Sequence, residues 1–141
     1  MPNNSEIDIL LVGNGGSSFE ILKSILRGYP RLSSLRWCDN CVDGIEEINR
    51  LRPGLVLLSS NLYFEEVITC VKAIRQQRPR QVSLVLLDDH HEYQRLLEFG
   101  VSEILMDGYS VQELFDRIDY LQVSNALRNI SQSDIEIGQT A

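Results

Sequence analysis

Residues 42–62 read VDGIEEINRLRPGLVLLSSNL, and this stretch joins a helix-period pattern to a short apolar run. Apolar side chains recur every three or four residues in its first half, which predicts an amphipathic helix. These side chains are Val42, Ile45, Ile48 and Leu51. Pro53 ends that helix, because a proline ring cannot continue one. Residues 55–58 are all apolar, which is typical of a parallel strand covered on both faces.

The same alternation of strand and helix runs along the rest of the chain. Apolar runs at residues 7–12, 82–87 and 104–106 predict three more strands, and residues 32–38 predict a weaker one with Leu35 and Trp37 on one face. A helix-period segment follows each of these strands. Five such units favour parallel pairing through right-handed crossovers. The predicted fold class is therefore α/β, a doubly wound five-stranded parallel sheet in a three-layer sandwich.

Local signals mark two helix ends and one domain boundary. Ser17 or Ser18, with Glu20 close behind, predicts the cap of the first helix, and Gly100 predicts the end of the fourth. After about residue 128 the sequence turns polar. We therefore expect one domain over residues 1–128 and a polar tail over residues 129–141, either flexible or the start of a linker to an output domain.

Composition excludes several classes of function. The chain has 141 residues, a formal net charge of -7 and a pI of about 4.8. Phosphate backbones and anionic membranes repel so acidic a domain, so we expect no direct nucleic-acid binding and no membrane contact. The N-terminus has no basic region and no small-residue cleavage site of a secretory signal. Three cysteines, an odd number, argue against a disulfide framework, and we expect a cytoplasmic protein.

Ligands of such sheets bind at the carboxyl ends of the strands, which here are residues 13–16, 59–61, 86–89 and 107–109. At these positions the chain resembles the receiver domain of two-component response regulators. The resemblance covers about residues 7–122 and is closest to receivers attached to LuxR-type DNA-binding domains. It rests on IDILLV (7–12), on the stretch quoted above (42–62) and on GVSEILMDGYSVQEL (100–114). It implies the flavodoxin-like (βα)5 receiver fold and a role in signal transduction.

The residues that receivers need for aspartyl phosphorylation are replaced here. Two metal-binding acids align with Gly13 and Asn14, the acceptor Asp with Ser59, and the essential Lys with Asp107. Mg²⁺ requires oxygen ligands such as carboxylates, and a serine hydroxyl cannot form an acyl phosphate. The family's Thr or Ser falls within residues 86–88, none of which carries a hydroxyl. We therefore predict a degenerate receiver, a pseudo-receiver with no catalytic residue, metal or cofactor.

The resemblance implies that such a domain regulates a signalling or transcription pathway by protein contact and is not an enzyme. In receivers, the face made by the fourth helix, fifth strand and fifth helix carries the signal, often through a two-fold dimer. We expect a partner protein or a homodimer on this face. Tyr109, at the family's aromatic switch position, would lie near its rim, and Gln112, Asp116 and Asp119 would be exposed. DNA would be reached only through an output domain.

Two alternatives stay open. Gly15, Gly16, Ser17 and Ser60 could hold a small anionic ligand, which would make the chain the N-terminal receiver of a DNA-binding regulator with a small-ligand input. The other interpretation of this loop is a flexible segment left after the metal ligands were lost.

The second alternative is a thiol redox protein. Residues 37–41 read WCDNC, similar to the WCxxC motif of thioredoxins, which would pair Cys38 with Cys41. The simpler interpretation places Cys38 in the core and Cys41 in a loop. His90 and His91 point about 100° apart on a helix, so they favour an exposed helix start over a metal site.

Overall fold

The computed structural model describes residues 6–99, 101 and 103–140, with side chains described as far as residue 127. The chain divides into two compact units, Met1–Tyr109 and Ser110–Ala141. Among the described residues, no helix combines the length and the apolar character that crossing a membrane requires.

The first unit is a five-stranded parallel sheet with four helices, which confirms the predicted fold class. Its strands are β1 (Ile7–Val12), β2 (Leu32–Cys38), β3 (Leu55–Leu58), β4 (Ser83–Leu87) and β5 (Ile104–Met106). Its helices are α1 (Ser17–Arg27), α2 (Cys41–Leu51), α3 (Phe64–Gln77) and α4 (His90–Glu98). Four strands have the predicted bounds, and β4 begins one residue later than predicted.

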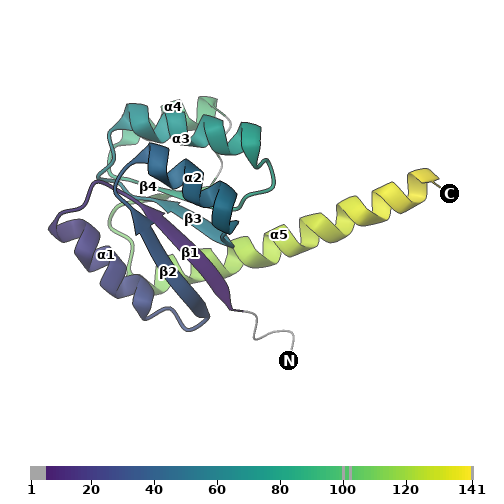
Figure 1. The fold of residues 1–141 in the computed structure, drawn as a ribbon, viewed down its shortest axis with the longest axis horizontal. Helices are drawn as coiled ribbons and strands as arrows, with labels where there is room; N and C mark the ends of the chain where they lie inside the picture. The colour runs from purple at the N-terminus through teal and green to yellow at the C-terminus, as the bar shows by residue number, and fades with distance from the viewer. Residues whose placement is uncertain (1–5, 100, 102, 141) are drawn as a thin grey trace. The chain divides into compact units, whose positions relative to one another are not determined.

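The strand order β2-β1-β3-β4-β5 places the switch of chain direction between β1 and β3. α1 lies on one face of the sheet and α2, α3 and α4 lie on the other (Figure 1). β3 is buried on both faces, and so is β1 except at Asp8; Leu11, Leu57 and Leu58 have no exposed surface. Burial on both faces explains why the sequences of these two strands are largely apolar and do not alternate with polar residues. The carboxyl ends of β1 and β3 therefore lie side by side over a rigid core.

The predicted cap of α1 is wrong. Gly16 occupies the cap position with a φ of 93°, and no side chain caps the helix. Ser17 is the first helical residue and is exposed, because the glycine loop turns tightly enough to start the helix without a capping hydroxyl. α2 does have a side-chain cap, in which Asn40 Oδ1 accepts from the Asp43 amide at 2.8 Å. Gly100, predicted to end the fourth helix, lies outside the described residues.

The second unit is one helix, α5 (Val111–Thr140), of 30 residues. Ser110 and Glu113 form a reciprocal cap at its start, since each side chain accepts from the other residue's amide, at 3.1 and 3.0 Å. Leu114, Ile118 and Leu121 are buried. The segment predicted to be a polar tail continues this helix to Thr140, and its side chains lie outside the described part of the chain.

Candidate functional site

The carboxyl ends of β1 and β3 meet in the first unit, as the resemblance implies for a phosphorylation site. The Ser59 amide donates to the Val12 carbonyl at 2.8 Å, so the loops that follow both strands start side by side. Gly13 is buried, Asn14 is exposed, and Ser59 leaves only 4% of its surface exposed. The structure thus brings three of the four aligned positions together, and none of the three carries a charge.

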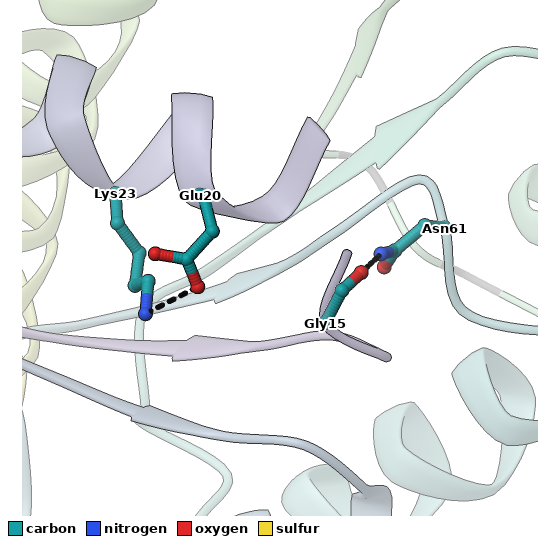
Figure 2. Close-up of polar contacts among 4 residues, drawn as sticks. All are labelled: Gly15, Glu20, Lys23 and Asn61. Carbon is teal, nitrogen blue, oxygen red and sulfur yellow. Dashed lines mark hydrogen bonds and ion pairs between the residues drawn. The ribbon is translucent and has the colours of Figure 1, made fainter. Parts of the chain in front are cut away.

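Asn61 fastens the two loops to each other. Its Oδ1 accepts from the Asn14 amide at 3.1 Å, and its Nδ2 donates to the Gly15 carbonyl at 2.8 Å. In return, Asn14 Nδ2 donates to the Asn61 carbonyl at 2.9 Å. Figure 2 shows the Asn61 amide reaching Gly15 across the space between the loops. Polar groups that would otherwise face a ligand therefore satisfy one another.

Phe19 fills the space beside Gly13. A Cβ atom at Gly13 would lie 2.4 Å from Cε1 of the Phe19 ring and 2.9 Å from Asn61 Oδ1. Phe19 is itself buried on α1, so its ring has little room to move away. Gly13 does not have a positive φ, so its backbone conformation would suit other residues. The lack of space for a Cβ atom is what favours glycine at this position. A carboxylate at this position would require both neighbours to shift.

The possible ligand-binding residues are divided between exposed and covered positions. Gly15 and Gly16 have positive φ values of 80° and 93°, which suits glycine, and Gly16 and Ser17 are exposed. Ser60 is half-buried. Of the amides in this loop, that of Asn14 is already used by Asn61. A small-ligand site here remains a prediction.

Asp107 follows β5, and β4 separates β5 from β3 in the sheet. Its side chain is exposed, and its amide donates to the Leu87 carbonyl at 2.7 Å. Tyr109 is half-buried, and burial together with the negative charge of Asp107 raises the pKa of its hydroxyl. Where a phosphorylated receiver would present a cation, this strand end presents an anion.

The cysteines are arranged differently from the simpler interpretation of the sequence. Cys41 is the first residue of α2 and is buried, so its predicted place in a loop is wrong, whereas Cys38 ends β2 and packs against the core while staying partly exposed. The reason is that α2 starts one residue before Val42, the first side chain of the predicted apolar repeat, and carries Cys41 onto the core. There Cys41 shares a hydrogen bond with Cys70 of α3. All three cysteines are free, and burial raises the pKa of each thiol.

His90 and His91 begin α4, as predicted, and both are exposed. Asp89 caps this helix, because its Oδ1 accepts from the His91 amide at 2.7 Å. Within the described residues, no three metal-binding side chains come together. The carboxylate of Asp89 serves as the helix cap of α4.

Two side chains close the site, Asn61 and Phe19. Sequence reasoning placed Asn61 at the end of the third strand without its contacts, and it missed the role of Phe19. Both residues lie close in sequence to the predicted positions. The contact between Asn61 and Asn14, however, joins residues 47 positions apart along the chain. An amide three residues after the third strand is the one local signal that pointed toward the Asn61 contact. Phe19 was assigned only to the apolar face of its helix.

Comparison with known proteins gives structural neighbours only. No family model matches the chain, and no curated protein matches it. A signal receiver domain of an HD domain-containing protein from Pseudomonas fluorescens Pf-5 has 18% identity and a TM-score of 0.72, covering 86% of this chain and 98% of that one. A response regulator receiver domain from Clostridium thermocellum has 14% identity and a TM-score of 0.73, covering 85% and 97%.

The NtrC4 receiver domain, solved as a beryllofluoride-activated dimer, has 16% identity and a TM-score of 0.69, and the match covers 84% of this chain and 98% of that one. These likenesses extend over the sheet and helices that position the strand-end loops. The chain has the fold of response regulator receiver domains.

Proposed function

We propose that this chain is a regulatory domain that acts in a cytoplasmic signalling or transcription pathway by protein contact, without phosphorylation. The observation that carries the proposal is the closed strand-end site, where Asn61 joins both loops and Phe19 fills the space at Gly13. The receiver fold supports the regulatory role. DNA would be reached only through an output domain.

The chemistry of the site supports the absence of phosphoryl transfer. Mg²⁺ binds through carboxylate oxygens, and the positions at the ends of β1 and β3 offer only Gly13, Asn14 and Ser59. A serine phosphate ester lacks the lability of an acyl phosphate. Asp107 would repel a phosphoryl group that a cation should attract. The change of acceptor alone prevents formation of an acyl phosphate, and the other changes also remove the metal ligands and the neutralising cation.

We expect no phosphoryl uptake when the protein is incubated with acetyl phosphate, with or without Mg²⁺. Intact-mass spectrometry should show the unmodified mass only, and Mg²⁺ should cause no saturable shift of the Gly13–Gly16 amides in NMR spectra. A receiver with an intact acidic site, treated in parallel, controls for reagent activity. A mass increase of one phosphoryl group that hydroxylamine removes would refute the proposal.

The exposed apolar face of α5 is the contact surface that we propose. Tyr120, Val123 and Leu127 lie three and four residues apart, so they share one face of the helix. They leave 62%, 56% and 59% of their surfaces exposed, which is unusual for large apolar side chains. Successive residues turn by about 100°, which places this face opposite the buried Leu114 and Ile118.

The polar residues predicted for this surface divide in two groups. Gln112 and Asp116 are exposed and bonded to each other, with Gln112 Nε2 donating to Asp116 Oδ1 at 2.8 Å. By the same helical geometry they extend the face of Val123 toward the start of α5. Asp119 is half-buried and engaged elsewhere, which makes it a poorer probe. Tyr109 belongs to the first unit, so this face of α5 does not include it.

We expect the protein to form a homodimer through α5 and Val123→Asp to raise its dissociation constant at least about fivefold, because a carboxylate would replace buried apolar surface. Sedimentation velocity over a wide concentration range measures this. The matched control is Val42→Asp, which places the same charge on another exposed valine, on α2. Equal effects of the two substitutions, or a wild-type protein that stays monomeric at millimolar concentration, would contradict the contact.

A further inference from the structure

A groove runs along the edge strand β2 on the side that faces α2. Its wider part has a volume of about 570 Å³ and lies between the end of β2 and α2. Its narrower part, of about 250 Å³, continues toward the start of β2. Both parts are lined by Leu10 and Arg36, so they are continuous. The groove is formed by β1, β2, α2 and the residues that follow α2, all within the first unit.

The strand beside this groove has one open edge. β2 is the outermost strand, and its seven residues make it the longest in the sheet, whereas β5 at the other edge has three (Figure 1). The Cys38 carbonyl accepts from the Gly13 amide, so alternate residues of β2 face β1. The backbone groups of Leu35 and Trp37 therefore point to the open edge. Unpaired groups of this kind accept an added strand.

The two faces of β2 differ. On the α1 side, Trp37 lies under Lys23, whose Nζ is 4.0 Å from the ring centroid, and yet 45% of the Trp37 surface stays exposed. On the α2 side, Ser34 and Arg36 line the groove. A strand added beside β2 would point alternate side chains to these two faces. One row would meet the apolar Trp37 ring, and the other would enter the groove.

The charge of the groove indicates which side chains of an added strand should enter it. Four carboxylates line the wider part, and they outnumber the guanidinium groups of Arg36 and Arg50. They belong to Asp39, Asp43, Glu46 and Glu47. Arg50 is already paired with Glu47 at 2.6 Å, which leaves an excess of negative charge toward the opening. At the groove floor, burial and then the charges of Glu47, Asp43 and Asp39 raise the pKa of the Cys38 thiol.

We propose that the groove beside β2 docks an extended segment of a partner protein, with lysine or arginine alternating with apolar residues, as a sixth strand of the sheet. The unpaired edge supplies backbone hydrogen bonds, and the carboxylates supply attraction for one row of side chains. The surface uses only residues of the first unit, so it does not depend on the contact proposed for α5.

The test uses the full chain and a synthetic eight-residue peptide of alternating lysine and valine. We expect saturable NMR shifts centred on the amides of Leu35, Trp37 and Glu46. A second peptide, N-methylated on alternate residues, keeps the charges and cannot pair with the edge, so it should lose binding. Glu46→Lys should weaken binding roughly fivefold, because attraction becomes repulsion. Glu98→Lys, the same change on an exposed residue of α4, should leave binding unchanged.

Three results would overturn the proposal. The first is the absence of shifts at millimolar peptide. The second is equal binding of the N-methylated peptide or of a glutamate-valine peptide, which would remove the strand or the charge from the mechanism. The third is self-association that Glu46→Lys abolishes in the absence of peptide, which would assign the edge to a second copy of the chain.

Discussion

At pH 8, Cys38 in the folded protein is expected to react with iodoacetamide between about tenfold and a hundredfold more slowly than in the unfolded chain. Burial, followed by the charges of Glu47 and Asp43, raises the pKa of this thiol from its ordinary 9.0 to about 11. Two pKa units lower the thiolate fraction about a hundredfold, and the greater basicity of the remaining thiolate offsets up to about tenfold of that. Mass spectrometry of quenched samples measures the rate.

Charge and burial are separated by one substitution. Asp43→Asn removes a carboxylate and keeps the shape, so Cys38 should react faster, while Glu98→Gln, far along the chain on α4, should change nothing. The pH profile gives a second reading. Because the folded pKa is raised, the protonated thiol stabilises the fold below about pH 9, and that stability is lost as the pH rises toward 11. A fast, low-pKa Cys38 would refute this account.

Slow thiols also bear on the redox alternative. Reactive cysteines of redox proteins have lowered pKa values in electropositive, accessible surroundings. Here the pKa values of all three thiols are raised, and Cys41 forms its hydrogen bond with Cys70. The WCDNC stretch resembles a redox motif in letters only, because its second cysteine begins α2 and faces the core. The surroundings therefore favour the regulatory function over thiol chemistry.

The fold could be predicted from the sequence because its inner strands, β1, β3 and β4, are buried on both faces over most of their length. Such strands appear as largely apolar runs, as β1 and β3 do, whereas the edge strand β2 alternates and was recognised by Leu35 and Trp37 on one face; β1, β2, β3 and β5 have the predicted bounds. The helix cap at Ser17 or Ser18 failed, because a glycine loop can start a helix by backbone geometry alone. The residue types around Ser17 do not reveal that backbone geometry.

The position of the candidate site could be predicted from the sequence, but the side-chain contacts that close it could not. Aligned residues located Gly13, Asn14 and Ser59 at adjoining strand ends, and the structure places them there. The closing of the site was not predictable, because it depends on side chains that meet only when the two loops are folded together. Asn61 reaches Asn14 and Gly15 across the sheet, and Phe19 reaches Gly13 from α1.

We expect Gly13→Asp to lower the free energy of unfolding by about 3 kcal/mol, since overpacking a buried site costs roughly 1–3 kcal/mol and a desolvated carboxylate adds to it. The new Cβ would lie 2.4 Å from the Phe19 ring. Urea unfolding followed by circular dichroism measures the loss. The matched control is Asn14→Asp, which places a carboxylate on the next, exposed residue and should cost only about 1 kcal/mol through one lost hydrogen bond.

A double-mutant cycle identifies the cause of that loss. If the Phe19 ring fills the space that a side chain at residue 13 needs, then Phe19→Leu should relieve Gly13→Ala, and the two changes should couple by about 1 kcal/mol or more. Independent effects would mean that the ring moves aside freely, and a single reinstated acid could then fit. Strong coupling would mean that the site cannot regain a metal ligand by one substitution. The absence of phosphorylation that we propose would then depend on the packing of α1 against the end of β1 as well as on the residues at the site.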